Sequence, residues 1–182
     1  IIRDSYLQGG KLLVCGNGGS AADADHIVGE LMKGFLKKRP LRAELKEALL
    51  QAGMNQADAD YLQGALPAIN LSAHTSLMTA TINDNGSETI FAQQVIGYGR
   101  SGDVLLGIST SGNSKNVLSA IKAAKALGLK TIGLTGVSGG KMAELCDVTI
   151  RVPENETYKI QELHLPVYHA LCAMIEEEFF GE

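Results

Sequence analysis

The chain has 182 residues, of which 45% are hydrophobic and 20% are charged, and its formal net charge at pH 7 is −4. These values fit one soluble globular domain, covering residues 1–182, that is long enough to bury a sizeable core. A mildly acidic chain with 5% aromatic residues and no Trp lacks the basic, stacking surface of nucleic-acid-binding proteins, and no apolar run is long enough to cross a membrane, so we expect neither partner.

The cysteines and the N-terminal residues indicate the cellular compartment in which we expect to find the protein. Cys15, Cys146 and Cys172 are odd in number and lie in apolar patterns, which favours buried thiols in a reducing cytosol over disulfides. No signal peptide is visible, so we expect a cytoplasmic protein. Two Ile residues stand directly before a charged turn at the start of the chain, which indicates that a helix is missing upstream.

Five short apolar runs alternate with segments that can form helices. The runs cover residues 11–15, 66–72, 103–108, 131–134 and 148–152. This alternation predicts an α/β fold, a doubly wound, five-stranded parallel sheet flanked by helices. In such sheets ligands bind outside the carboxyl ends of the strands, so the loops that follow the strands are the first place to search for a site.

A Gly-rich loop follows the first run: residues 15–20 read Cys-Gly-Asn-Gly-Gly-Ser. Free backbone N–H groups at the start of a helix can bind an anion such as phosphate, and Ser20 can cap that helix. A tight turn with a Ser cap is the structural alternative. On the predicted helix, His26 and Glu30 lie one turn apart on the same face. They could hold a metal or share a proton, although a surface pair is the commoner explanation of this spacing.

Residues 37–64 contain two features of less specific meaning. The basic cluster Lys37-Lys38-Arg39 is predicted to be a solvated helix end. Residues 40–64 show helical spacing on both sides of Gly53, which predicts a helical-hairpin insert. The insert could be a lid, a subunit contact or a neutral decoration, and the sequence does not choose between these.

A turn and a second polar loop come next. Residues 83–86, Asn-Asp-Asn-Gly, are turn formers, although Asn83 and Asp84 could point into a cleft. Residues 109–114, Ser-Thr-Ser-Gly-Asn-Ser, follow the third run and precede a helical pattern over 116–127. Four hydroxyl groups with free N–H groups at a helix start make a cradle for phosphate. A capping turn is the alternative, but a cap uses only one hydroxyl.

Neither loop has the Lys of a P-loop or the acidic partner of a dinucleotide site. These absences favour a small phosphorylated ligand over a nucleotide. A third turn, residues 134–140, resembles the other two weakly, and we expect it to be only a loop.

The last predicted helix, residues 156–180, is apolar around most of its circumference, with one expected kink at Pro166. Such a helix should pack against another subunit as well as its own sheet. It also carries polar residues, which are costly to bury without partners, so at least one should be functional. Periodicity leaves open which of His164 and His169 faces inward. These polar residues are Gln161, Glu162, His164 and His169.

Three segments together resemble the sugar isomerase (SIS) family. They are residues 15–30, with the Gly-rich loop, His26 and Glu30; residues 103–114, with the hydroxyl-rich loop; and residues 159–169, with Gln161 and His169. The resemblance covers nearly the whole chain apart from the insert. It implies an α/β SIS fold and an enzyme that converts sedoheptulose 7-phosphate to a mannoheptose 7-phosphate, a step towards nucleotide-activated heptose for bacterial surface polysaccharide such as lipopolysaccharide.

The resemblance also implies roles for individual residues. Glu30 would be the base and His169 the second acid/base group of the isomerisation. A homotetramer with sites between subunits is implied, as is one Zn²⁺ per subunit. The implied zinc ligands are His26, Glu30, Gln161 and His169. The implied phosphate ligands are Ser109, Thr110, Ser111 and Ser114, and the sugar pocket would be lined by Asn17, Gly18, Gly19, Glu30, Asn83, Asp84 and Gln161.

Two other classes of function compete with the isomerase. A non-catalytic SIS protein, either a sugar-phosphate-sensing regulator or an adaptor of the bacterial replication initiator, would share the phosphate loops. We expect such a protein to lose members of the acid/base and metal set, whereas this chain keeps all four. A nucleotide-binding flavodoxin-like domain fits the strand alternation but neither loop.

Overall fold

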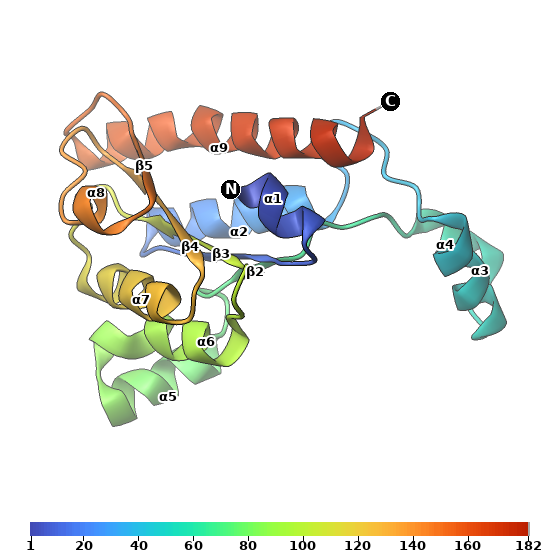
Figure 1. The fold of residues 1–182 in the computed structure, drawn as a ribbon, viewed down its shortest axis with the longest axis horizontal. Helices are drawn as coiled ribbons and strands as arrows, with labels where there is room; N and C mark the ends of the chain where they lie inside the picture. The colour runs from blue at the N-terminus through green and yellow to red at the C-terminus, as the bar shows by residue number, and fades with distance from the viewer. Residues whose placement is uncertain (182) are drawn as a thin grey trace.

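A computed structural model of the protein describes residues 1–181. Figure 1 shows a central sheet with helices on both faces and two short helices that project away from the body. The elements are α1 (Ile2–Leu7), β1 (Leu12–Cys15), α2 (Gly19–Met32), α3 (Ala43–Gln51), α4 (Gln56–Tyr61), β2 (Ala68–Asn70), α5 (Thr75–Asn85), the 3₁₀ turn η1 (Ser87–Thr89), α6 (Ile90–Tyr98), β3 (Val104–Ile108), α7 (Lys115–Ala126), β4 (Lys130–Thr135), α8 (Met142–Leu145), β5 (Val148–Arg151) and α9 (Thr157–Phe180).

The five strands form one parallel sheet in the order β2-β1-β3-β4-β5. Each predicted strand is present, so the predicted doubly wound α/β fold is confirmed. All residues of β1 and β3 are buried. Helices on both faces exclude water from them, which explains why these strands read as continuous apolar runs.

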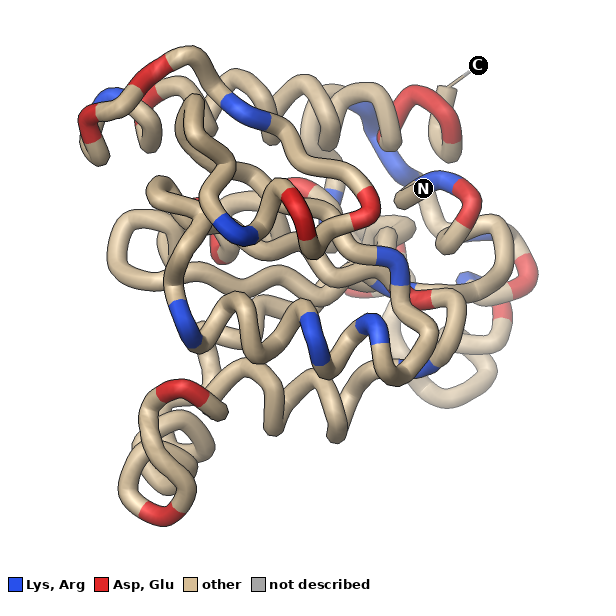
Figure 2. The backbone as a smooth tube through the Cα atoms, turned by 60° about the vertical axis from the view of Figure 1, so that its left-hand side comes forward, with Lys and Arg blue, Asp and Glu red and all other residues tan. Residues whose placement is uncertain are grey.

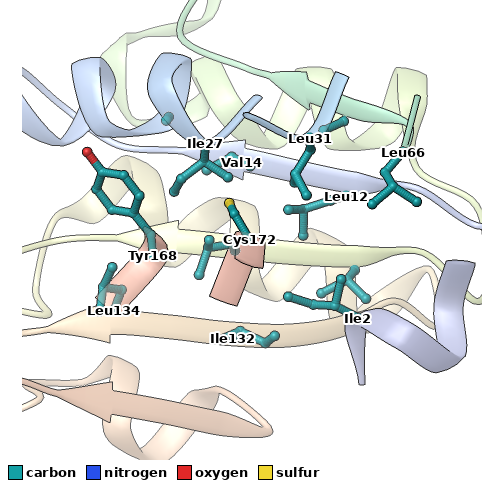
Figure 3. Packing of buried hydrophobic residues seen from close by; sticks show 14 of the residues in the cluster. Ile2, Leu12, Val14, Ile27, Leu31, Leu66, Ile132, Leu134, Tyr168 and Cys172 are labelled. Atoms are coloured by element: carbon teal, nitrogen blue, oxygen red, sulfur yellow. The ribbon is translucent and has the colours of Figure 1, made fainter. Parts of the chain in front are cut away.

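Side chains of alternate residues along β1 enter two separate cores, as a strand's period of two requires. Leu12 and Val14 pack with residues of α1, α2 and α9, including Tyr168 and Cys172 (Figure 3). Leu13 and Cys15 pack on the other face against α6 and α7. The sheet therefore fixes α2 and α9 side by side in one layer.

The predicted helical hairpin is present as α3 and α4, which extend away from the sheet (Figure 1). At its base, Pro40 and Gln63 form an isolated antiparallel bridge. Lys46 and Asp60 form an ion pair that joins the two helices. No residue of α3 is buried. The insert is thus held by its own contacts and stands clear of the core.

Two local expectations are wrong. Helix α2 begins at Gly19 after Gly18, whose φ is +57°, so Ser20 lies inside the first turn, buried, and does not cap the helix. Arg39 is not solvated but is 1% exposed, because its guanidinium pairs with Glu176 of α9. The chain between α2 and the insert is therefore anchored to α9.

Helix α9 is continuous through Pro166 over 24 residues. Within residues 1–181, no helix combines the length and apolarity that a membrane crossing requires. Basic and acidic residues are both spread over the fold (Figure 2), but single elements mostly carry charges of one sign, as in α7, whose charged residues are all Lys.

Candidate active site

The two polar loops meet at one edge of the sheet. Strand β1 lies between β2 and β3, so chain connections leave it in opposite directions, and a crevice forms where the loops after β1 and β3 diverge. Asn17 of the first loop and Asn116 at the start of α7 exchange two amide hydrogen bonds. Asn17 Nδ2 donates to Asn116 Oδ1 at 2.9 Å, and Asn116 Nδ2 donates to Asn17 Oδ1 at 2.8 Å. This pair ties the Gly-rich loop to the hydroxyl-rich loop.

The hydroxyl-rich loop does not use its N-cap side chain to cap helix α7. Ser114 is the N-cap residue of α7, but its side chain makes no capping bond. Its Oγ lies instead 2.9 Å from Ser109 Oγ. Gly112 has a φ of +65°, and a Cβ there would collide with the Gly139 carbonyl. Hydroxyl groups at a helix start are thereby left available to an anion.

The third turn, expected to be only a loop, supports the hydroxyl-rich loop from behind. The Gly136 N–H donates to the Thr110 carbonyl at 3.0 Å, and the N–H of Met142, the first residue of α8 after the turn, donates to the Gly112 carbonyl at 3.1 Å. Gly139 and Gly140 both have positive φ, and a Cβ on Gly140 would collide with the Ser111 carbonyl. These contacts fix the loop's backbone without occupying its hydroxyl groups.

Three titratable side chains converge between α2 and α9. His26 Nε2 lies 3.0 Å from Glu30 Oε1 and 3.3 Å from His169 Nε2. One ligand atom from each residue lies within 4.8 Å of the other two. Glu30 is 14% exposed, and its other oxygen lies 3.6 Å from Lys33 Nζ. Two imidazoles and a carboxylate are a donor set that suits zinc.

The arrangement of these three side chains also favours a bound cation, for an electrostatic reason. Lone pairs of a carboxylate and of two neutral imidazoles that point at one region repel one another unless a proton or a metal ion lies between them. His26, Glu30 and His169 therefore form a group that could hold a divalent metal ion.

Tyr168 contacts this cluster and Asp23 lies beside it, and the sequence assigned neither of them a role. Tyr168 is 1% exposed, and its hydroxyl lies 2.9 Å from His26 Nδ1. Burial, reinforced by the nearby Asp23 carboxylate, raises the pKa of Tyr168 to about 12. Burial also raises the pKa of Asp23, against the opposing effects of Tyr168 and His26. Tyr168 belongs to the apolar stripe of α9, so the sequence pattern identified it only as a core residue.

The structure resolves the question of the two histidines on α9. His164 is fully buried, and both of its ring nitrogens lack a hydrogen-bond partner among residues 1–181. Burial lowers its pKa below the usual 6.5, against a smaller opposing effect of the Thr135 backbone. His169 lies instead in the cluster beside α2. Of the two, His169 is therefore the one in position for chemistry.

Gln161 lies near the N-terminal end of α9, close to the first residue of α2. A Cβ on Gly19 would be 2.5 Å from Gln161 Nε2, so the glycine makes room for the amide where α2 begins. Gln161 precedes His169 by eight residues, which is roughly 12 Å along a helix axis. The structure brings Gln161 next to the Gly-rich loop, and its role as a metal ligand stays a prediction.

Asn83 and Asp84 are exposed at the end of α5. Asn83 Nδ2 donates to Asp84 Oδ1 at 2.8 Å. Their contribution to a sugar pocket also stays a prediction.

Comparisons with known proteins decide the family. Residues 59–136 match the sequence model of the SIS domain. A phosphoheptose isomerase from Rhodospirillum rubrum is 45% identical to the chain over 177 residues, which are 97% of this chain and 81% of that relative. The chain belongs to the phosphoheptose isomerase family. The expected resemblance to SIS proteins is thereby confirmed.

Solved structures of phosphoheptose isomerases have the same fold as this family member. The protein from Francisella tularensis has a TM-score of 0.80 and 36% identity. The protein from Neisseria gonorrhoeae has a TM-score of 0.78 and 38% identity. Each comparison covers 97% of this chain and 81% of the solved chain.

Proposed function

We propose that this protein converts sedoheptulose 7-phosphate to D-glycero-D-manno-heptose 7-phosphate, as a cytoplasmic step towards nucleotide-activated heptose for bacterial surface polysaccharide. Membership of the phosphoheptose isomerase family favours this reading over a non-catalytic regulator or an adaptor. The observation that carries it is the convergence of Glu30, His26 and His169 between α2 and α9.

The spacing of the two polar regions suits this substrate. In sedoheptulose 7-phosphate the reacting carbons, C1 and C2, and the phosphate are at opposite ends of the molecule. Helix α2 starts beside the Gly-rich loop at Gly19 and reaches the cluster at His26, roughly 10 Å further along its axis. A seven-carbon chain can thus place its phosphate in the hydroxyl-rich loop while its C1 end lies near the cluster.

The predicted residues then share the binding of the substrate. Ser109, Thr110, Ser111 and Ser114 bind the phosphate. Asn17, Gly18, Gly19 and Gln161 line the sugar. Asn83 and Asp84, which are exposed on α5, complete the pocket of a neighbouring subunit in a homotetramer.

The isomerisation moves one proton between two carbons and one between two oxygens. Glu30 takes a proton from C1 and returns it to C2 of the resulting enediol. His169 transfers a proton to the oxygen on C2 and accepts the proton from the oxygen on C1, so the carbonyl group moves from C2 to C1. The 14% exposure of the Glu30 side chain limits exchange of the carried proton with water.

His26, Glu30 and His169 would hold the metal ion, which we propose is Zn²⁺, with Gln161 as a predicted fourth ligand. The ion, when bound, would stabilise negative charge on the substrate oxygens in the enediol stage.

Purified protein incubated with sedoheptulose 7-phosphate tests the proposal, with aldose formation followed by NMR. We expect the anomeric signals of a heptose 7-phosphate to grow until equilibrium. An intact, zinc-loaded oligomer that leaves the ketose unchanged would contradict the substrate assignment. A protein that binds the ketose without turnover would favour the regulator.

A further inference from the structure

His26 presents its two ring nitrogens to different surroundings. Nε2 faces Glu30 and His169 at 3.0 and 3.3 Å, whereas Nδ1 lies 2.9 Å from the Tyr168 hydroxyl. A neutral imidazole has one N–H donor and one acceptor nitrogen. The hydrogen bond at Nδ1 therefore decides whether Nε2 offers a lone pair or a proton to the cluster.

The Tyr168 hydroxyl has one proton and can give it to only one acceptor. If that proton went to His26 Nδ1, the proton of the ring would be on Nε2, where a metal ligand must have its lone pair. If the proton goes elsewhere, the Tyr168 oxygen can accept the N–H of His26 Nδ1.

Asp23 is the acceptor that makes the second arrangement the favourable one. It precedes His26 by three residues on α2, and its Oδ2 is buried with no hydrogen-bond partner among residues 1–181. The Asp23 and Tyr168 side chains also lie within hydrogen-bonding reach of each other. A carboxylate can only accept, and an unpaired buried carboxylate oxygen is costly.

We propose that Asp23 and Tyr168 are positioning residues for the metal group: the Tyr168 hydroxyl donates to Asp23 and accepts from His26 Nδ1–H, so that His26 Nε2 presents its lone pair beside Glu30 and His169. The proposal rests on the metal group of the proposed function and extends it by two residues. Partners of this kind commonly fix the orientation and the tautomer of a histidine that binds a metal.

Zinc affinity of the purified protein tests the proposal, measured by competition with a chromophoric chelator. Tyr168→Phe removes only the hydroxyl, and we expect it to weaken zinc binding roughly 10- to 100-fold. Asp23→Asn should weaken binding in the same direction, because its amide can donate to the Tyr168 oxygen and send the phenolic proton to His26.

Tyr6→Phe is the matched control. Tyr6 is 9% exposed, and its hydroxyl donates to the Pro67 carbonyl at 3.2 Å, away from the cluster. We expect the control to bind zinc as tightly as the wild type. Equal affinity of Tyr168→Phe and wild type would overturn the proposal.

The tautomer of His26 gives a second measurement that does not need the variants. In ¹⁵N-labelled, zinc-bound wild-type protein, long-range ¹H–¹⁵N NMR spectra should show the His26 proton on Nδ1. A proton on Nε2, or wild-type protein that binds no zinc, would overturn the proposal. Zinc binding with the expected variant effects but no turnover of sedoheptulose 7-phosphate would support it while contradicting the isomerase assignment.

Discussion

The guanidinium of Arg39 and the carboxylate of Glu176 form a buried ion pair, with 2.7 Å between Nε and Oε1. Arg39 also donates to the carbonyl oxygens of Leu31, at 2.6 Å, and Glu30, at 2.9 Å. Glu176 accepts hydrogen bonds from three backbone N–H groups of residues 35–37. This pair closes the C-terminal end of α2, so it holds the backbone of the proposed base against α9.

Glu176→Gln should therefore destabilise the fold strongly. Removing one charge of a buried pair leaves the other uncompensated, which costs roughly 3–5 kcal/mol. Its neighbour Glu177 pairs with Lys37 at the surface and is 63% exposed, so Glu177→Gln should change the free energy of unfolding by less than about 1 kcal/mol. Urea denaturation of both variants measures the difference. Equal midpoints for the two would show that the buried pair adds nothing.

The same carboxylate should make the fold sensitive to acid. Burial acts to raise the pKa of Glu176, but hydrogen bonds from the Phe35 and Leu36 N–H groups and from Arg39 outweigh it, so the pKa lies below the usual 4.5. A lowered folded-state pKa gives stability that is complete above the unfolded-state value and is lost as the pH falls through the folded-state value.

We therefore expect the free energy of unfolding of wild-type protein to fall more steeply below pH 4.5 than that of Glu176→Gln. Urea titrations of both proteins at several pH values measure the two slopes. Parallel slopes would contradict the assigned cause.

Gly19→Ala tests whether Gln161 belongs to the sugar pocket. The new Cβ would lie 2.5 Å from Gln161 Nε2, so the amide must move while the fold persists. We expect KM for the sugar phosphate to rise several-fold. In Gly29→Ala, the control on the same helix, the new Cβ meets no atom of the other described residues within 4 Å beyond the backbone of its own helix, and helix propensity makes this change neutral or slightly stabilising. Steady-state kinetics that do not distinguish the two variants would remove Gln161 from the pocket.

Ser114→Ala should weaken phosphate binding without unfolding the protein. Its hydroxyl contacts only Ser109 Oγ in the described chain and does not cap α7. A hydrogen bond to a charged group contributes roughly 1.5–3 kcal/mol, which corresponds to a rise in KM of about 10- to 150-fold. Ser119→Ala, further along α7, is the control with unchanged KM. A Ser114→Ala protein with wild-type KM would place the phosphate elsewhere.

The five-stranded sheet could be predicted from the sequence, because strands that are covered on both faces must be apolar throughout. Its strand limits were less accurate: 66–72 was predicted, whereas β2 is Ala68–Asn70. Leu66 and Leu71 are buried but lie outside β2, although the Leu71 N–H still donates to the Val14 carbonyl of β1 at 2.8 Å. The buried apolar run is therefore longer than the strand within it.

The sequence placed His26 and Glu30 on one helix face correctly, because a four-residue step is local. Contacts between distant segments of the chain could not be predicted from the sequence. Arg39 and Glu176 are 137 residues apart, and a basic cluster gives no sign of a buried partner. Tyr168 fits the apolar stripe of α9. The contact of its hydroxyl with α2 can be recognised only in the folded structure, where the two helices pack together.

The rate at which Glu30→Gln forms aldose from sedoheptulose 7-phosphate tests the central claim most directly, beside wild-type protein and Glu47→Gln. Glu47 lies on the exposed insert, where its carboxylate accepts only from Gln51 among the residues that the structure describes. We expect wild type and Glu47→Gln to turn over equally, and Glu30→Gln to lose at least about 100-fold in kcat, the lower bound for removing a general base, while still binding the sugar phosphate. Wild-type kcat in Glu30→Gln would contradict the account.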